Sequence, residues 1–342
     1  MTRYENMKNP TAERVLLAAE LRAREGPTSI AALLDTSEQL VQYHLRRLEA
    51  AEAILGYNAL VDVQRIGYSF HLLYLSFFGL TSAEELRWIK YVASEVSGVA
   101  LVARTIGRWN ALVGVIAANN RELASIVTKV CKHATGKVAD LVITTEVECT
   151  YSSLQLLGKW KPVVISTSTD ADSEHSAIDE LDLQILEALA RDCRPSAAEI
   201  ARILGSSPST TLRRIDELER RRVILGYRVQ IDYEQYGFYQ YRLLLRLSDS
   251  RSSTLSDIGK FALESGVVES VSRYLGMADL DIRCYARTLT NLADFVAALR
   301  DRFHTIVTNV DIVPVFYWRR MNYFPVSLEF GDAKGRPHKA RA

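Results

Sequence analysis

Residues 196–220 read SAAEIARILGSSPSTTLRRIDELER, and this stretch decides the fold. It opens with Ser-Ala-Ala-Glu, which has the form of a capping box, followed by apolar residues at helical spacing. Gly205 accepts the left-handed conformation that a sharp turn requires. Ser207 suits an N-cap, and Pro208 suits the first position of the next helix, where its missing N–H costs nothing. Two short helices joined by a tight turn predict a helix-turn-helix.

A third helix is predicted directly before this pair. Residues 179–192 (DELDLQILEALARD) begin with Asp179, a residue that caps helix N-termini well. The apolar residues that follow it keep the helical period, and they are Leu181, Ile185, Leu186 and Leu189. The three helices together predict a module of the kind that places its last helix in the major groove of DNA.

The last helix of the module is the predicted recognition helix. We expect Leu212, Ile215 and Leu218 to face inward and the polar and basic side chains near the N-terminus to face DNA. Arg suits guanine edges, and Ser and Thr suit phosphates. The predicted DNA-binding residues of this helix are Ser207, Ser209, Thr210, Thr211, Arg213 and Arg214. The alternative is a solvated face with ion pairs such as Arg213–Glu217.

The sequence repeats itself after 170 residues. Residues 31–67 match residues 201–237 at 11 of 37 gapless positions, whereas chance gives roughly two or three. The longest run of identities is Ile-Leu-Gly-Tyr, at residues 54–57 and 224–227. The similarity continues with a one-residue slip in the turns at residues 107–110 and 276–279. A period of this length indicates two copies of a domain pair, because solenoid repeats are much shorter.

The first copy of the module is degraded. Residues 205–228 hold six Arg and three acidic residues, a net charge of +3, whereas residues 35–58 hold two Arg and four acidic residues, a net charge of −2. Attraction to phosphates therefore favours the second copy. The base-reading candidates of the first copy are Gln39, Tyr43, His44 and Arg47. The alternative is a first module that serves mainly for packing.

A sheet domain is predicted after each module. Leading strands are expected at residues 55–63 and 225–233. Further strands are expected at residues 71–77, 100–104, 111–117 and 141–148, with helices at 82–97 and 121–133. In the second copy the strands are expected at residues 241–247, 268–273, 281–286 and 310–317, with helices at 255–265 and 291–303. The order βαββαβ is that of a ferredoxin-like domain, so the fold class is α+β, in two copies of a helix-turn-helix and a ferredoxin-like domain.

These patterns set the predicted domain boundaries. Residues 166–176 (STSTDADSEHS) are polar and hold three acidic residues, which is typical of a linker. The predicted units are a degenerate helix-turn-helix with its linking strand at 1–67, a ferredoxin-like domain at 68–152, a linker at 153–178, the second helix-turn-helix at 179–237, the second ferredoxin-like domain at 238–322 and a basic tail at 323–342.

Composition excludes several classes of protein. The 342 residues carry 42 Lys and Arg against 41 Asp and Glu, and 48% are hydrophobic, as in soluble globular proteins. With a net charge of only +1, nucleic-acid binding requires a local basic patch. The four cysteines are scattered and expected to be reduced. No apolar run spans a bilayer and the N-terminus has no signal-peptide core, so we expect a cytoplasmic protein. No nucleotide-binding or catalytic motif occurs, and we expect no cofactor, metal or catalytic residue.

The helix-turn-helix, the Gly-Tyr strand and the βαββαβ domain with a Gly-x-x-Asp turn together resemble the Lrp/AsnC family of feast/famine transcription regulators. The resemblance extends over nearly the whole chain, as two successive copies, and is closest over residues 179–237. It implies binding to double-stranded DNA through the helix-turn-helix and dimerisation through the sheets. It also implies sensing of an amino acid or another small metabolite at contacts between the sheet domains. We therefore expect the two sheets to pack on each other within one chain, with further homo-oligomerisation.

The resemblance also implies a place for the effector. In the family the Gly-x-x-Asp turn lies beside the small-molecule site, which points to Gly276 and Asp279. The counterparts in the first copy are Gly107 and Asn110, where an amide replaces the carboxylate. The alternative is that both glycines only form tight turns between strands.

Two other functions remain open. Some proteins of this architecture decarboxylate sirohaem, with His and Arg holding the substrate carboxylates. The matching stretches here lack the His-containing motif of that branch, and Arg104 and Arg273 are the carboxylate-binding candidates that remain. The other alternative is a protein-interaction module that has lost DNA binding.

Overall fold

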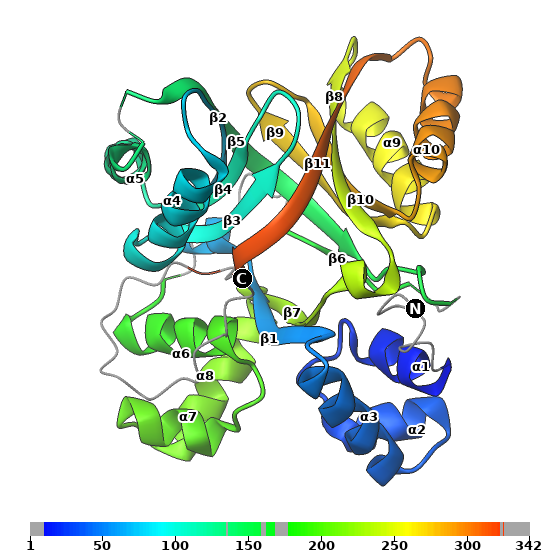
Figure 1. Ribbon diagram of the computed structural model, residues 1–342. Coiled ribbons are helices and arrows are strands. Elements are labelled where there is room, and N and C mark those ends of the chain that lie inside the picture. The colour runs from blue at the N-terminus through cyan, green and yellow to red at the C-terminus, as the bar shows by residue number, and fades with distance from the viewer. Residues whose placement is uncertain (1–9, 135, 159–161, 168–176, 322–323, 325–342) are drawn as a thin grey trace.

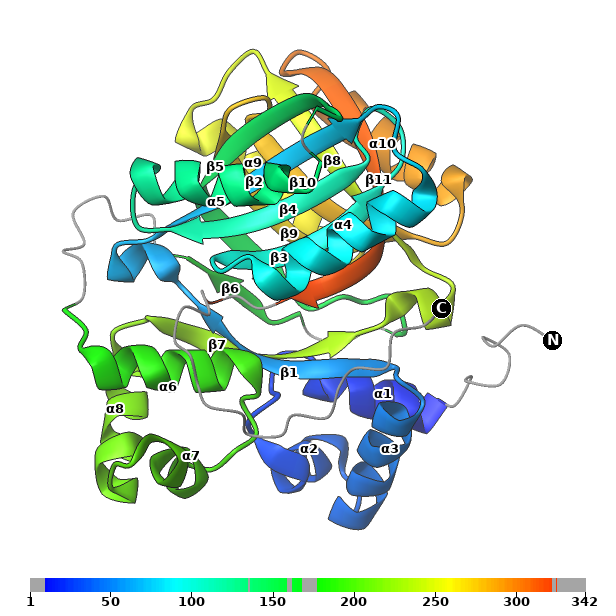
Figure 2. The same cartoon turned by 60° about the vertical axis from the view of Figure 1, so that its left-hand side comes forward.

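The computed structural model describes residues 10–134, 136–158, 162–167, 177–321 and 324. Helical modules lie on one side of the molecule and a sheet with four covering helices on the other, with strands β1 (Ile54–Val61) and β7 (Ile224–Ile231) between them (Figures 1 and 2). The predicted mixed α+β class is confirmed. None of the helices in the described ranges is long and apolar enough to cross a membrane.

One order of elements occurs twice along the chain. The first half contains α1 (Pro10–Ala19), α2 (Gly26–Leu34), α3 (Glu38–Ala50), β1, η2 (Val63–Ile66), β2 (Ser69–Phe77), α4 (Ser82–Glu95), β3 (Val99–Thr105), β4 (Ala111–Ala117), α5 (Asn120–Lys132) and β5 (Val138–Ser152). After β6 (Val164–Ser166), the second half contains α6 (Glu180–Arg191), α7 (Ala197–Leu204), α8 (Pro208–Arg220), β7, η3 (Tyr233–Tyr236), β8 (Tyr239–Leu247), α9 (Ser252–Glu264), β9 (Val268–Leu275), β10 (Leu280–Ala286), α10 (Leu289–Arg302) and β11 (Val307–Met321).

Helix ends follow the predicted capping residues. The Ser196 side chain accepts from the Glu199 amide, and the Glu199 carboxylate accepts from the Ser196 amide, which completes the capping box of α7. Gly205 ends that helix in the left-handed region, at φ 69°. Asp35 ends α2 in the same region, at φ 50°, because Asp tolerates it better than most residues. Ser207 caps α8 by accepting from the Thr210 amide, as the sequence predicts.

The strands form a closed barrel. The order β2-β4-β3-β11-β8-β10-β9-β5 closes because β2 also pairs with β5, and β6 extends the sheet beside β5. Each half contributes four strands in the ferredoxin-like order, and within each half these strands pair antiparallel. The halves join edge to edge, β3 to β11 and β5 to β9. The two sheets therefore meet within one chain, as expected, and they form one barrel.

The two longest strands differ most from the prediction. The sequence places strands at residues 141–148 and 310–317, whereas β5 spans Val138–Ser152 and β11 spans Val307–Met321. Both strands pair within their own half and with the other half, β5 with β2 and β9 and β11 with β8 and β3. The additional partner extends each strand, and such partners are not encoded in the local sequence pattern.

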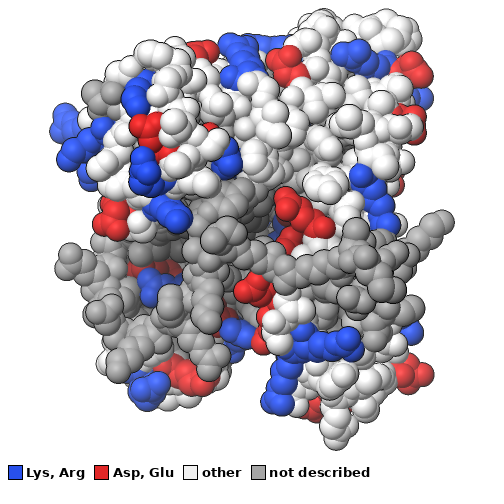
Figure 3. All heavy atoms as spheres, in the orientation of Figure 1, with Lys and Arg blue, Asp and Glu red and all other residues white. Residues whose placement is uncertain are grey.

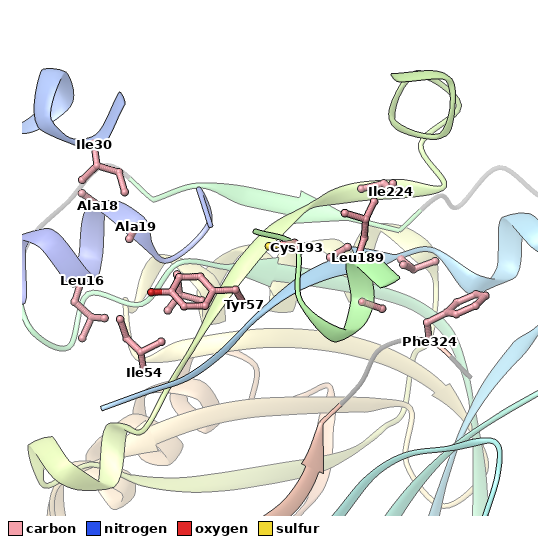
Figure 4. Close-up of a cluster of buried hydrophobic side chains, with 14 of the residues drawn as sticks. Leu16, Ala18, Ala19, Ile30, Ile54, Tyr57, Leu189, Cys193, Ile224 and Phe324 are labelled. Carbon is pink, nitrogen blue, oxygen red and sulfur yellow. The ribbon is translucent and has the colours of Figure 1, made fainter. Parts of the chain in front are cut away.

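Four larger cores occur among the described residues, two within single halves and two shared between the halves. One core lies under α4 and α5, and a second lies under α9 and α10. A third fills the barrel with side chains from both halves, including Leu72, Leu112 and Leu244. The largest joins the helical modules, and Figure 4 shows Ile30 and Leu189, from different halves, in this cluster.

The structure describes parts of the predicted linker and one residue of the predicted tail. Residues 162–167 are described, and β6 within them pairs with β5. The hydroxyls of Thr150 and Ser166 lie 3.0 Å apart across this pair of strands. Residues 168–176 of the predicted linker lie outside the described residues. In the predicted tail only Phe324 is described, and its side chain is buried in the largest core (Figure 4).

Candidate nucleic-acid interface

Helix α8 presents a polar N-terminal face. Ser207, Ser209 and Arg213 are exposed, and Thr210 is half-buried. The three hydroxyls lie close together, with Ser207 Oγ 3.1 Å from Ser209 Oγ and 2.8 Å from Thr210 Oγ1. Such a cluster at a helix N-terminus suits phosphate oxygens.

Arg213 extends from this face into solvent. Glu217 pairs with Arg220 at 2.6 Å, so the ion pair on this face joins Glu217 to Arg220 and not to Arg213. In the part of the chain that the structure describes, Arg213 forms no ion pair. Its guanidinium therefore keeps all its donors for a base edge or a phosphate.

Two predicted contacts on α8 are wrong. Arg214 pairs with Asp179 at 2.7 Å and with Asp182 at 3.1 Å, so it fastens α8 to α6. Thr211 is fully buried, and its hydroxyl lies 2.6 Å from that of Ser206. Thr211 thus belongs to the interior of the module, and the half-buried Arg214 is held by the two carboxylates.

The inward stripe of α8 also differs from the prediction. Thr211, Ile215 and Leu218 are the buried residues, and Leu212 is 51% exposed. The spacing of four and then three residues is the regular helical repeat. A hydroxyl residue occupies the first inward position because Ser206 in the turn provides a partner for it.

Sequence reasoning missed Arg202 on α7. This side chain is exposed on the helix that precedes the turn. In a helix-turn-helix that helix crosses the DNA backbone, so a basic residue on it suits a phosphate. The sequence could have indicated Arg202. Ala201 is buried, and adjacent residues of a helix lie on different faces, so Arg202 is directed away from the buried face.

The recognition helix of the first module is less suited to DNA. Gln39, Tyr43 and Arg47 are exposed on α3, and Tyr43 is 56% exposed. His44 is 4% exposed, and burial lowers the pKa of its imidazole, so the side chain is a neutral part of the interior. The prediction of His44 as a base-reading residue is therefore wrong. His44 and Arg214 occupy the same position of the repeat, and both face inward.

The two modules are fastened together by matching contacts. The Arg24 guanidinium donates to the Cys193 carbonyl at 2.6 Å and lies over the Tyr227 ring. In the opposite direction, Arg194 pairs with Glu49 at 3.2 Å and lies over the Tyr57 ring. Strands β1 and β7 pair alongside these contacts.

This junction fixes the recognition helices relative to each other. Both α3 and α8 lie on the side of the β1–β7 ribbon away from the barrel (Figures 1 and 2). Basic side chains are also exposed over the first module in the view of Figure 3, where Arg46 and Arg47 of α3 are exposed. The molecule thus presents α3 and α8, with different sets of exposed side chains, on the same side of the β1–β7 ribbon.

The predicted effector turn packs at the junction of the halves. Asp279 accepts from the Leu247 amide at 2.9 Å through Oδ2. Gly276 has φ 137°, and a Cβ there would lie 3.0 Å from Cγ2 of Thr144 on β5. Asn110 has the same role as Asp279, accepting from the Phe77 amide at 2.7 Å. Gly107 is open, because a Cβ there would meet no described atom within 4 Å beyond its chain neighbours.

A buried cluster of charges joins the first module to the barrel, and no pattern in the sequence indicates it. Arg228 of β7 contacts Glu269 of β9 at 2.5 Å and Glu20 at 3.3 Å. Arg283 of β10 contacts Glu269 at 3.5 Å. Burial raises the pKa of Glu20 to about 7, although Arg228 opposes the shift. Burial acts in the same direction on Glu269, but Arg228 and Arg283 outweigh it and lower the pKa of that carboxyl.

A second buried pair lies inside the barrel. Arg242 contacts Asp281 at 2.6 Å, and the Tyr74 hydroxyl donates to the same carboxylate at 3.0 Å. Tyr74 belongs to the first half and the ion pair to the second, so the hydrogen bond ties the halves together. Arg104, a carboxylate-binding candidate from the sequence, is engaged by Glu85 through two hydrogen bonds of 3.1 Å.

Comparisons with known proteins agree with this geometry. The model of the AsnC-type helix-turn-helix domain matches residues 178–219. The HTH-type transcriptional regulator LrpA of Pyrococcus horikoshii is 31% identical over 122 residues, which cover 35% of this chain and 84% of that protein. The Bkd operon transcriptional regulator of Pseudomonas aeruginosa is 30% identical over 120 residues, which cover 35% of this chain and 78% of that protein.

A solved structure resembles the whole chain. The siroheme decarboxylase NirDL superposes with a TM-score of 0.60, covering 94% of this chain and 96% of the other. The sequence identity is 11%, so the likeness concerns the fold alone.

Proposed function

The chain belongs to the Lrp/AsnC family of DNA-binding transcriptional regulators, and from this premise we propose that α8 is its principal recognition helix. The observation that carries the proposal is Arg213, which is exposed, forms no ion pair in the described part of the chain and stands beside the hydroxyl cluster of α8. Arg213 reads a base edge, while Ser207, Ser209 and Thr210 contact phosphates.

The first module contacts the other side of the same DNA site with lower affinity. Gln39, Tyr43 and Arg47 are its available side chains, and the net charge of its recognition region is −2 against +3. The junction between the modules holds both helices in one arrangement. We therefore expect an asymmetric operator whose stronger half is specified by α8.

The chain is a tandem of two Lrp/AsnC units with the predicted domain boundaries. The repeated order of elements and the 170-residue sequence repeat support this organisation. The barrel then takes the place of a dimer of sheet domains in a single chain. Further homo-oligomers form through the outer surfaces of these domains, in the cytoplasm, and sedimentation velocity measures them directly.

Regulation responds to a small effector near Gly276–Asp279. The family resemblance supports this place, and the site lies where the second half packs on β5 of the first half. Thermal shifts with each of the twenty amino acids test it on the wild type and on Asp279→Asn. A stabilising amino acid whose effect is lost in Asp279→Asn supports the site. An effect that survives there but vanishes when Asn110 is changed places the site in the other half.

The chain acts without catalysis. Arg104 is engaged by Glu85, and the likeness to the decarboxylase fold comes without sequence similarity. Incubation of the protein with sirohaem, followed by chromatography of the pigment, tests this statement. Unchanged pigment is the expected result, and loss of its carboxylates would contradict it.

Selection of duplexes from a random pool tests the proposed DNA binding. We expect one enriched motif with a strong half and a weak half. Binding to that motif should weaken with added salt, because Arg202 releases counterions when it contacts a phosphate. Recovery of unselected sequences after repeated rounds would refute sequence-specific binding.

A further inference from the structure

A cleft of about 340 Å³ lies in the first module, between α1, α2 and α3 and the second module. Its apolar floor includes Ala19, Ile30 and Tyr57, and Figure 4 shows these three on the α1 side of the core, away from Leu189. Its charged lining residues are Arg24, Arg46, Arg194 and Glu49. A cleft of this volume with an apolar floor and a few charged groups is typical of small-molecule sites.

Three arginines and one glutamate line the cleft, and two of the arginines have no carboxylate partner among the described residues. Arg24 is held by two neutral groups, the carbonyls of Cys193 at 2.6 Å and Pro195 at 3.2 Å. Arg46 is exposed and forms no ion pair with any described residue. Arg194 differs, because it pairs with Glu49 and with Asp192. Two guanidinium groups without carboxylate partners attract an anion, and Arg binds carboxylates through paired hydrogen bonds.

The repeat provides a comparison for this cleft. At the corresponding positions of the second module, Leu189 replaces Ala19 and Asp216 replaces Arg46. Both residues are buried, and the side chain of Leu189 is the larger of the two. Asp216 places a negative charge where the first module has the positive charge of Arg46. The features that make the cleft receptive to an anion are therefore specific to the first module.

We propose that the first module binds a small organic carboxylate in this cleft. The apolar body of the ligand packs on Ala19, Ile30 and Tyr57, and its carboxylate accepts hydrogen bonds from Arg24 and Arg46. The site is separate from the turn at Gly276–Asp279 and goes beyond the proposed function, since α8 reads DNA without it. Because Arg194 and the carbonyl partners of Arg24 belong to the second module, an occupant contacts the junction that sets the two recognition helices.

Calorimetric titration of the full chain without DNA tests the proposal. The probes are 2-naphthoate, phenylacetate and octanoate, each compared with its uncharged amide. The variants Ala19→Leu and Arg46→Asp introduce the residues of the second module. The control is Arg47→Asp, which makes the same charge change on the same helix but does not line the cleft.

We expect at least one carboxylate to bind with one site per chain, and its amide to bind at least about tenfold more weakly, as for loss of a charged hydrogen bond. Ala19→Leu and Arg46→Asp should each weaken binding by about tenfold or more, and Arg47→Asp by less than about twofold. If Ala19→Leu does not fold, Arg46→Asp decides.

Three results would overturn the site. The first is that no carboxylate shows saturable binding below about 1 mM. The second is that acid and amide bind equally well. The third is that Arg46→Asp and Arg47→Asp weaken carboxylate binding to the same extent. Loss of DNA affinity in Arg46→Asp with unchanged carboxylate binding would identify Arg46 as a phosphate contact, and it would also overturn the proposal. Since the titration contains no DNA, its outcome is independent of whether α8 binds DNA.

Discussion

Arg213 and Arg214 are adjacent in the sequence and have different roles. Arg214 is engaged by Asp179 and Asp182, whereas Arg213 extends into solvent. Arg214→Ala should therefore lower the free energy of unfolding by about 1–2 kcal/mol, because it leaves the buried Asp182 without its ion-pair partner. Arg213→Ala should change it by less than about 0.5 kcal/mol. Urea titrations of the two variants measure both values, and equal losses would contradict the assignment.

Glu20 connects stability to pH. Its pKa rises from 4.5 in the unfolded chain to about 7 in the folded protein, mainly through burial. Between these values the folded state holds a proton that the unfolded state has released, so rising pH favours unfolding. The free energy of unfolding of the wild type should therefore fall between about pH 5 and about pH 8. In Glu20→Gln this fall should be smaller by at least about 1 kcal/mol, because glutamine does not titrate. Urea midpoints across this range test it, and parallel pH profiles would contradict it.

The turns between strands show how one motif acts differently in the two halves. Gly276 has φ 137° and packs against Thr144, whereas Gly107, at φ 106°, has open space around it. Gly276→Ala should therefore lower the free energy of unfolding by about 2–3 kcal/mol, through backbone strain and a steric clash. Gly107→Ala should cost only the backbone strain, about 1 kcal/mol. Thermal unfolding of both variants compares them, and the opposite order would show that the clash at β5 is absent.

Element patterns in the sequence predicted the local structure well. The residues that cap α6, α7 and α8 lie within a few positions of the helix ends, so these ends could be predicted from the local sequence. The pairing of β3 with β11 and of β5 with β9 joins segments far apart in the chain, and no local pattern reports such partners. The directions of Thr211 and Arg214 were missed for a similar reason, because each bonds to a residue in the turn or at the preceding helix.

The whole molecule is expected to unfold as one unit. The barrel closes with strands of both halves, and the largest core contains Ile30 from the first half and Leu189 from the second. Separate unfolding of either half would expose these shared cores. Scanning calorimetry should therefore give a single transition whose calorimetric and van't Hoff enthalpies agree. Two resolved transitions would show that the halves are independent domains.

The central claim, that α8 leads the recognition of DNA, is tested most directly by fluorescence anisotropy on the selected duplex. At one fixed salt concentration, Arg213→Ala should weaken binding by about 1–3 kcal/mol, the value of a base contact. Arg47→Ala, the matched loss of an exposed arginine on α3, should cost less than about 0.5 kcal/mol. Equal losses in the two variants, or an affinity that neither variant changes, would contradict the account.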